Sequence, residues 1–225
     1  MVPWNDIDTV LFDLDGTLLD LHFDTFFWLE HVPRRFAEHH GLPVDEAKAD
    51  VTARLKREAG TLRWYCIDHW SRELDLDILA LKREVAHLIS IHDGTEELLT
   101  ALRMNAKRLV LTTNAHAESL ALKMHRTGLE KYFDEMVCSH SLGAAKESAA
   151  FWCRLERSTS FDRRRTLFVD DSLPVLSTAC NFGIRHVLAI RRPDTRAPAR
   201  DTGSFPALDR LQDLLGGIPA GTDRC

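Results

Sequence analysis

Two aspartates separated by a single residue stand directly after an apolar run near the start of the chain. Asp13-Leu14-Asp15-Gly16-Thr17 follows Thr9-Val10-Leu11-Phe12. A short, near-continuous apolar run is typical of a buried strand, so both carboxylates would emerge together at the edge of a sheet. Carboxylates this close repel each other unless a cation lies between them or one of them is protonated. The pair therefore predicts a site for metal-assisted nucleophilic chemistry, although an Asp-Gly turn closing a hairpin would use the same residues.

Further polar residues stand close to the ends of other predicted strands. They are Thr113 and Asn114 after Arg108–Thr112, Lys146 after a weaker strand at Met136–Ser139, and Asp170, Asp171 and Ser172 after Thr166–Val169. Groups at the carboxyl ends of parallel strands meet at one edge of the sheet. Together with the first pair they would supply two carboxylate pairs, a hydroxyl and an ammonium. A phosphoryl group and a divalent cation require that set of groups together.

Each of these residues also has an ordinary structural explanation. Thr113 with Asn114, and Asp170 with Asp171, could cap the helices that follow them. Lys146 could be a solvated surface residue, although its charge opposes the dipole of the helix expected to begin beside it. The occurrence of all the groups in order at matching strand ends favours one shared site.

The segments that must position these groups alternate between strands and helices. Near-continuous apolar runs, as expected of parallel strands covered on both faces, predict strands at Thr9–Leu14, Arg108–Thr112, Met136–Ser139, Thr166–Val169 and Val187–Ile190. Helical patterns fall at Glu96–Met104, Ala117–Thr127, Glu147–Glu156 and Pro174–Phe182. The alternation predicts an α/β fold with a doubly wound parallel sheet and right-handed crossovers.

One long stretch interrupts this alternation. Residues 21–91 contain no convincing strand and four helical patterns, at Phe23–His40, Asp45–Glu58, Thr61–Leu74 and Asp77–Ile89. We therefore expect a helical cap domain at 21–91, inserted into a core domain formed by 1–20 and 92–216. A short amphipathic helix is expected at Ala207–Leu215, followed by a flexible tail at 217–225.

Composition limits the classes of partner. The chain has 225 residues, a formal net charge of −5 and interspersed charges of both signs, so we expect no nucleic-acid partner. No signal peptide and no apolar stretch of membrane-spanning length is present in the sequence, which predicts a soluble, cytoplasmic protein without a membrane partner. A monomer or weak homodimer is expected.

Cysteines and histidines show no spacing typical of a zinc site. The five cysteines are scattered and odd in number, so we expect free thiols in a reducing compartment. His39, His40, His116 and His125 have no partners at ligand spacing, and surface positions are expected for them.

The ordered motifs resemble those of the haloacid dehalogenase (HAD) superfamily of hydrolases. They are Asp13-x-Asp15-Gly16-Thr17, Thr113-Asn114, Lys146 and Asp170-Asp171. The resemblance covers essentially the whole chain and implies a HAD-like, Rossmannoid core with a cap directly after the first strand. Within the superfamily the chain resembles bacterial GMP/IMP nucleotidases, in the segments Trp4–Leu11, Leu18–Leu21, Trp64–Asp68, Trp70-Ser71 and Leu111–His116.

The resemblance implies a role for each aspartate. Asp13 would be the nucleophile that forms an aspartyl-phosphate, and Asp15 would be the general acid and then the general base. Mg²⁺ would be held by Asp13, by the backbone carbonyl of Asp15 and by Asp171. Asp170 would ligate the ion through water or position one of its waters.

The resemblance also implies how the substrate is held. Thr113, the amide of Asn114 and Lys146 would bind the phosphoryl oxygens. Trp64 and Tyr65, in the cap, are the first candidates for stacking on a purine base, although aromatic residues at helical spacing usually pack in a core. The implied activity is that of a Mg²⁺-dependent purine 5′-nucleotidase acting on GMP and IMP.

Other functions remain open at this point. A haloacid dehalogenase would use the same fold without a metal, but it lacks an aspartate at the position of Asp15. A phosphatase or mutase acting on a small sugar phosphate would use the same core, and a non-catalytic regulatory module could retain the scaffold. Ala144 and Ala145 are smaller than the residues expected before the lysine in related nucleotidases, which leaves the specificity open.

Overall fold

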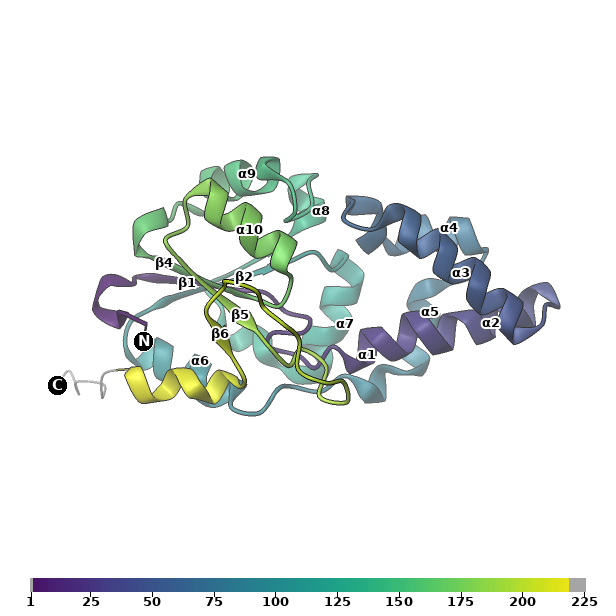
Figure 1. The fold of residues 1–225 in the computed structure, drawn as a ribbon, viewed down its shortest axis with the longest axis horizontal. Coiled ribbons are helices and arrows are strands. Elements are labelled where there is room, and N and C mark those ends of the chain that lie inside the picture. Colours follow the sequence, from purple (N-terminus) through teal and green to yellow (C-terminus); the bar gives the residue numbers. More distant parts are fainter. Residues whose placement is uncertain (1, 219–225) are drawn as a thin grey trace.

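The computed structural model describes residues 2–218 and is organised around one six-stranded parallel sheet (Figure 1). The strands are β1 (Thr9–Phe12), β2 (Arg108–Thr113), β3 (Glu135–Cys138), β4 (Thr166–Asp170), β5 (His186–Ile190) and β6 (Ala207–Leu208). Their order across the sheet is β3-β2-β1-β4-β5-β6, with every neighbouring pair parallel. In this register Phe12 lies beside Leu111 of β2 and Val169 of β4. The residues that follow these three strands therefore meet at one edge.

Four helices of ten or eleven residues cover the two faces of the sheet. They are α6 (Thr95–Met104), α7 (Ala117–Thr127), α9 (Ala149–Thr159) and α10 (Leu173–Phe182). Val10 and Phe12 point into the apolar cluster that contains α6 and α7, whereas Leu11 points into the cluster of α9 and α10. This alternation places helices on both sides of the central strand, as Figure 1 shows. The prediction of a doubly wound α/β fold is confirmed.

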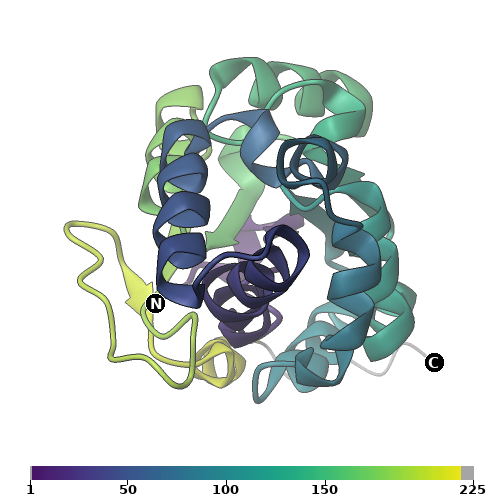
Figure 2. The ribbon, with the colours of Figure 1, turned by 90° about the vertical axis from the view of Figure 1, so that its right-hand side faces the viewer.

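A group of helices lies beyond the carboxyl edge of the sheet, at the right of Figure 1 and nearest the viewer in Figure 2. They are α1 (His22–Phe26), a π-helical turn (Phe27–His31), α2 (Val32–His40), α3 (Val44–Glu58), α4 (Ile67–Leu74) and α5 (Ile78–Glu84). We refer to these helices and their connections as the cap, and to the sheet with its flanking helices as the core. Leu19 forms an antiparallel bridge with Ile91, so the chain leaves and re-enters the core at adjacent points. The boundaries at residues 21 and 91 stay a prediction.

The remaining elements of the core and the cap are short. They are the 3₁₀ helices Trp4–Asp6, Leu62–Tyr65, Ala86–Leu88, Leu129–Tyr132, Arg163–Arg165 and Leu211–Gly217, and the single-turn helix α8 (Ser139–Leu142). Among the helices within residues 2–218, none combines the length and the hydropathy that a membrane span requires.

Two predicted cap helices are interrupted. The π-helical turn divides Phe23–His40, and Pro33, which has no N–H to donate, stands at the start of α2 directly after this turn. The predicted helix Thr61–Leu74 breaks at Cys66, which is extended and separates a 3₁₀ turn from α4. The indole of Trp70 donates a hydrogen bond to the Trp64 carbonyl at 2.7 Å, which satisfies that carbonyl at the break.

Two predictions in the core also need correction, and a third mostly falls outside the described residues. Helix α9 begins at Ala149 instead of Glu147, because Ser148 caps it by accepting a hydrogen bond from the Ala150 N–H at 3.2 Å. The predicted helix Ala207–Leu215 is wrong at its start, since β6 pairs there with β5 and the helix is a 3₁₀ helix from Leu211. Most of the predicted tail, residues 219–225, lies outside the described part of the chain.

Candidate active site

The turn after β1 carries the first pair of aspartates. The N–H of Asp13 donates to the Val169 carbonyl at 2.9 Å, which continues the pairing with β4 by one residue. Gly16 has a φ of +85°, and a Cβ at this position would lie 2.7 Å from the Asp171 carboxyl carbon. Only glycine allows the turn this conformation and this approach. The Asp-Gly pair thus serves to bring the turn against the loop after β4, and the alternative of a hairpin turn is wrong.

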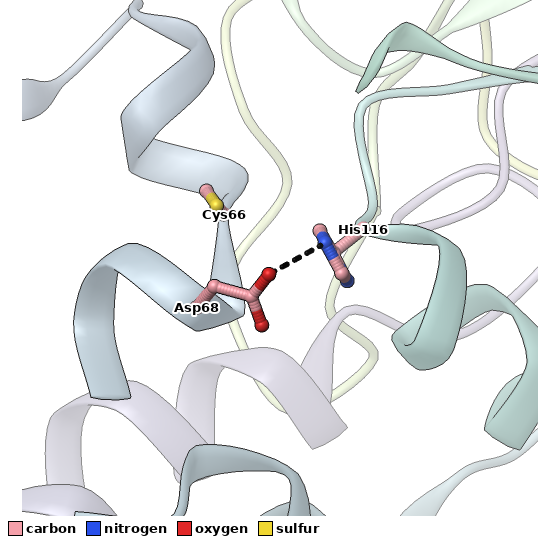
Figure 3. Close-up of side chains that lie close together, drawn as sticks. All are labelled: Cys66, Asp68 and His116. Atoms are coloured by element: carbon pink, nitrogen blue, oxygen red, sulfur yellow. Dashed lines mark ion pairs between the residues drawn. The ribbon is translucent and has the colours of Figure 1, made fainter. Parts of the chain in front are cut away.

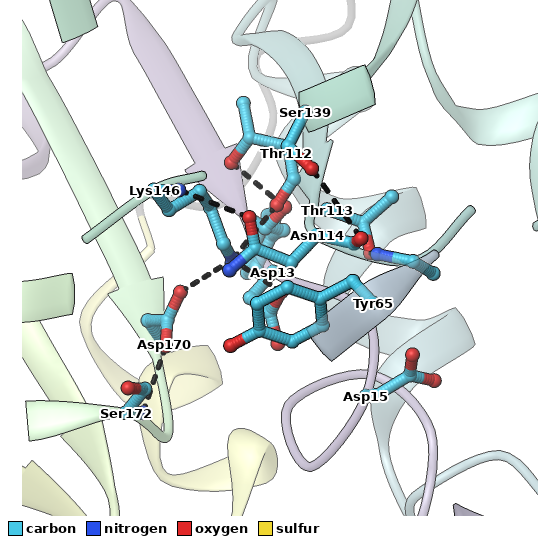
Figure 4. A network of polar contacts seen from close by, with 12 residues as sticks. Asp13, Asp15, Tyr65, Thr112, Thr113, Asn114, Ser139, Lys146, Asp170 and Ser172 are labelled. Atoms are coloured by element: carbon cyan, nitrogen blue, oxygen red, sulfur yellow. Dashed lines mark hydrogen bonds and ion pairs between the residues drawn. The ribbon is translucent and has the colours of Figure 1, made fainter. Parts of the chain in front are cut away.

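Lys146 lies at the centre of a buried polar network (Figure 4). Its ammonium donates to Asp13 Oδ1 and, at 2.7 Å, to Asp170 Oδ2. A third hydrogen bond goes to the Thr112 carbonyl at 3.1 Å. Lys146 is 2% exposed and Asp170 is 1% exposed, so one buried cation offsets the charge of two carboxylates away from bulk water. The expectation that Lys146 meets the aspartates after β1 and β4 agrees with this geometry.

The loop that carries Lys146 is fixed by side chains of the core. The Lys146 N–H donates to Asn114 Oδ1 at 3.0 Å, and its carbonyl accepts from the Trp152 indole at 2.9 Å. Asn114 also donates to Glu147 Oε2 at 3.0 Å. Asn114 therefore uses both ends of its amide to position this loop. The expected contact of Asn114 with the phosphoryl group is made by its backbone N–H, which these side-chain bonds do not involve, so that contact stays a prediction.

Thr113 ends β2 beside this network. It is 1% exposed and lines the cavity described below. Its hydroxyl oxygen accepts a hydrogen bond from the Ala115 N–H at 3.0 Å. This bond uses the acceptor side of the hydroxyl, so the O–H remains able to donate to an anion in the cavity.

Three carboxylates form a cluster at this edge of the sheet. Oxygens of Asp13, Asp170 and Asp171 lie within 4.8 Å of one another. Burial raises the pKa of Asp13 to about 7 against the opposing effect of Lys146, and burial together with Asp170 raises that of Asp171. A donor set made only of carboxylate oxygens suits a hard divalent cation such as Mg²⁺. Arg200 stands at the rim of the cluster, 3.3 Å from Asp171 Oδ2.

The side chain of Asp15 lies apart from this cluster, as Figure 4 shows, and it belongs to a second cluster of charged residues. Its Oδ1 lies 2.6 Å from the ammonium of Lys123, which lies 2.6 Å from Asp24. Lys82 reaches the other oxygen of Asp24 at 2.8 Å and stands 4.4 Å from the centre of the Phe27 ring. Burial raises the pKa of Asp15 to about 6, although Lys123 opposes this.

Sequence reasoning missed both lysines of this second cluster. Lys123 is 1% exposed and Lys82 is 3% exposed. Each interrupts an apolar helical stripe, with Leu120 and Met124 around the first and Ile78 and Leu81 before the second. A lysine on the buried stripe of a helix was the available signal.

The cap and the core enclose a cavity of about 630 Å³ above the carboxylate cluster. Its lining includes Asp13, Asp15, Thr113 and Lys146 from the core, and Trp28, Leu55, Trp64, Tyr65 and Ile67 from the cap. The phenol of Tyr65 donates to Glu147 Oε1 at 2.6 Å, so it ties the cap to the loop beside Lys146. Burial, and next to it Glu147, raises the pKa of Tyr65, which keeps the donor protonated. Trp64 lines the cavity from the 3₁₀ turn.

The four histidines expected at the surface differ in their exposure. His39, His40 and His125 are exposed, as expected. His116 is not a free surface residue, because its side chain is only 15% exposed and it lines the cavity. The expectation for His116 was therefore wrong, and the reason is that the cap covers the start of α7.

Comparisons with known proteins agree with the resemblance carried by the motifs. The model of the haloacid dehalogenase-like hydrolase family matches residues 7–183. GMP/IMP nucleotidase YrfG of Escherichia coli (strain K12) is 37% identical over 217 residues, which cover 96% of this chain and 98% of that protein. Pyrimidine 5′-nucleotidase YjjG of the same organism is 29% identical over 180 residues, covering 73% and 77%. A HAD phosphatase structure from Thermococcus onnurineus superposes with a TM-score of 0.80 at 23% identity, covering 96% and 99%.

Proposed function

The chain belongs to the haloacid dehalogenase-like hydrolases, and we propose that it hydrolyses purine nucleoside 5′-monophosphates, GMP and IMP among them, with the aid of Mg²⁺. Family membership and the nucleotidase relative identify a phosphomonoester hydrolase. One feature of the site is the main support for this mechanism. The buried Asp13–Lys146–Asp170 network opens into a cavity between cap and core, where a phosphoryl group can reach the Asp13 carboxylate.

The first half-reaction uses both aspartates of the turn after β1. A carboxylate oxygen of Asp13 attacks phosphorus, and the bond from phosphorus to the nucleoside oxygen breaks. Asp15 lines the same cavity and, after its side chain turns from Lys123 toward the substrate, donates its proton to the departing oxygen. The pKa of Asp15, raised to about 6, leaves part of the population protonated near neutral pH for this step. The products are the nucleoside and an aspartyl-phosphate at Asp13.

The second half-reaction returns the protein to its starting state. Asp15, now ionised, takes a proton from a water molecule whose oxygen attacks phosphorus. The bond between phosphorus and the Asp13 oxygen breaks, which releases inorganic phosphate and restores both side chains. The cap excludes other water from the cavity during these steps.

Lys146 and Thr113 stabilise the negative charge of the phosphoryl oxygens in different ways. All three N–H groups of the Lys146 ammonium already donate within the protein, so Lys146 acts as a fixed positive charge beside the phosphoryl group. The Thr113 hydroxyl supplies a neutral donor on the β2 side. Loss of one such donor typically lowers kcat by about 10²–10³-fold.

The carboxylate cluster fits a magnesium ion. Asp13 and Asp171 would hold it through side-chain oxygens, Asp15 through its backbone carbonyl and Asp170 through a water. When bound, Mg²⁺ supplies positive charge that offsets the repulsion between these carboxylates and the phosphate dianion.

Substrate specificity is assigned to the cap. Trp28 and Trp64 present aromatic surface to the cavity, and such faces stack on purine bases. The cavity volume of about 630 Å³ lies within the usual range for small-molecule sites, roughly 300–1,000 Å³. The name of the GMP/IMP nucleotidase relative gives the base class, and the aromatic wall supports it.

A panel of phosphomonoesters tests this proposal. The purified protein with Mg²⁺ is assayed for inorganic phosphate released from purine and pyrimidine 5′-monophosphates, sugar phosphates and an aryl phosphate. The proposal expects GMP and IMP to have the highest kcat/KM, and Trp64→Ala to lower it for these nucleotides while sparing the aryl phosphate. Equal or better hydrolysis of sugar phosphates would reject the purine specificity while retaining the phosphatase. No phosphate release from any ester would reject the whole proposal.

A further inference from the structure

Three potential metal ligands come together where the cap meets the core (Figure 3). Cys66 stands at the N-cap of α4 and Asp68 in its first turn, while His116 is at the N-cap of α7. One ligand atom from each of the three side chains lies within 4.8 Å of the others. His116 Nε2 is 3.8 Å from Asp68 Oδ2. None of these residues belongs to the carboxylate cluster around Asp13.

The chemistry of these three side chains differs from that of the magnesium cluster. A thiolate, an imidazole and a carboxylate are the donors that Zn²⁺ takes in proteins, whereas Mg²⁺ takes oxygen ligands. Cys66 has no disulfide partner and is therefore available as a thiolate donor. Small side-chain movements would bring the three atoms to zinc-binding distances of about 2.0–2.3 Å. Three protein ligands leave a fourth position for water.

Two histidine rings lie beside this cluster, each with one buried nitrogen that is unpaired in the described part of the chain. Nδ1 of His116 and Nε2 of His140 are both buried without a hydrogen-bond partner among residues 2–218. The two rings lie with centroids 4.9 Å apart, at 77° to each other. Burial, and next to it His116, lowers the pKa of His140. His116 faces Asp68 with Nε2, so Nε2 is the nitrogen that would bind the ion, and the unpaired Nδ1 lies on the other side of the ring.

We propose that Cys66, Asp68 and His116 bind one Zn²⁺, which bridges the cap to the core. The thiol of Cys66 releases its proton to solvent as the zinc–sulfur bond forms, so the affinity rises with pH. Because the bridge joins α4 of the cap to α7 of the core, it holds the cavity closed and slows substrate entry and product release. Zinc binding itself does not depend on the proposed function, whereas its effect on turnover does.

Zinc binding is measured with the full chain, reduced by a phosphine and kept in excess Mg²⁺ so that the carboxylate cluster is occupied. Competition with a chromophoric zinc chelator should give one zinc per chain, and Cys66→Ser and His116→Ala should each weaken it at least tenfold. Two matched controls, Cys180→Ser and His125→Ala, alter exposed residues and should bind zinc as the parent does. Unchanged affinity in Cys66→Ser and His116→Ala, or no zinc bound by the parent, would overturn the proposal.

Two further measurements separate this site from the carboxylate cluster. Co²⁺ added in place of Zn²⁺ should give a thiolate-to-cobalt absorption band that is present in Cys180→Ser and absent in Cys66→Ser. Turnover at saturating Mg²⁺ should be slowed by zinc in the parent and not in Cys66→Ser. Equal inhibition of both proteins would place the inhibitory zinc at the carboxylate cluster and overturn the closure by bridging. If the parent has no phosphatase activity, the proposed function is wrong, but the measured zinc binding still stands.

Discussion

Replacement of Lys146 by methionine removes the buried cation while keeping a side chain of similar length. Asp13 and Asp170 lose their shared counter-ion, and the Thr112 carbonyl loses a hydrogen bond at 3.1 Å. Both carboxylates are buried, so water cannot take the place of the ammonium. Breaking a buried ion pair in this way costs about 3–5 kcal/mol of unfolding free energy.

This loss is measurable by thermal unfolding in EDTA. For a protein of this size each kcal/mol lowers Tm by about 2–4 °C, so Lys146→Met should unfold roughly 6–20 °C below the parent. The matched control is Lys131→Met, because the Lys131 side chain is 61% exposed and its 3.5 Å contact with Glu96 is at the surface. The control should stay within about 0.5 kcal/mol of the parent.

The loss of stability in Lys146→Met should depend on pH in a defined direction. Burial raises the folded-state pKa of Asp13 to about 7, and it raises that of Asp170 too, while Lys146 opposes both shifts. In Lys146→Met these pKa values rise further, so between their unfolded and folded values the native state binds more protons than the unfolded state. Stability then falls as pH rises, and the deficit of the variant should be largest at alkaline pH and shrink as pH falls. A deficit under about 1 kcal/mol at pH 8, or one that grows in acid, would refute the role of Lys146 as buried counter-ion.

Three other outcomes are expected. Asp24→Asn should weaken folding near neutral pH by about 3–5 kcal/mol, because Lys82 and Lys123 lose their shared carboxylate. Burial opposes a low pKa for Asp24, but these lysines hold it well below its usual value, so the stabilisation is present above about pH 4 and is lost as pH falls. In denaturant titrations from pH 7 to 3, the unfolding free energies of the variant and the parent should approach each other. A difference that does not change with pH would contradict this assignment. Tyr65→Phe removes the hydrogen bond to Glu147, which is worth about 0.5–3 kcal/mol. In steady-state assays this variant should raise KM more than it lowers kcat. An unchanged KM would argue against Tyr65 as the link between cap and core. EDTA should abolish phosphate release and added Mg²⁺ should restore it, whereas full activity in the chelator would exclude a metal at the carboxylate cluster.

The sheet and the first cluster could be predicted because they depend on local patterns and one topological rule. The strand runs are apolar on both faces, and the carboxyl ends of parallel strands meet at one edge. Asp13, Lys146 and Asp170 therefore come together in the structure although 133 residues separate the first two. Gly16, too, stands where the close approach of Asp171 requires a glycine.

The features that were missed depend on contacts between distant segments. The position of Lys123 on the buried stripe of its helix does not identify its partner, because Asp24 is 99 residues away and meets it only when the cap packs on the core. Cys66 and Asp68 face His116 only because α4 lies over the start of α7. The short strand β6 exists because its backbone pairs with β5, and a two-residue strand has no periodicity that a sequence could display.

The most direct test of the account is to find the phosphoryl group on Asp13. The protein is mixed with Mg²⁺ and GMP, quenched in acid within a single turnover, digested and analysed by mass spectrometry. The account predicts a phosphorylated peptide containing Asp13, reducible by borohydride at that side chain and absent from Asp13→Asn, which should also have lost turnover. Normal turnover with the phosphoryl group on another residue, or sustained activity in Asp13→Asn, would contradict it.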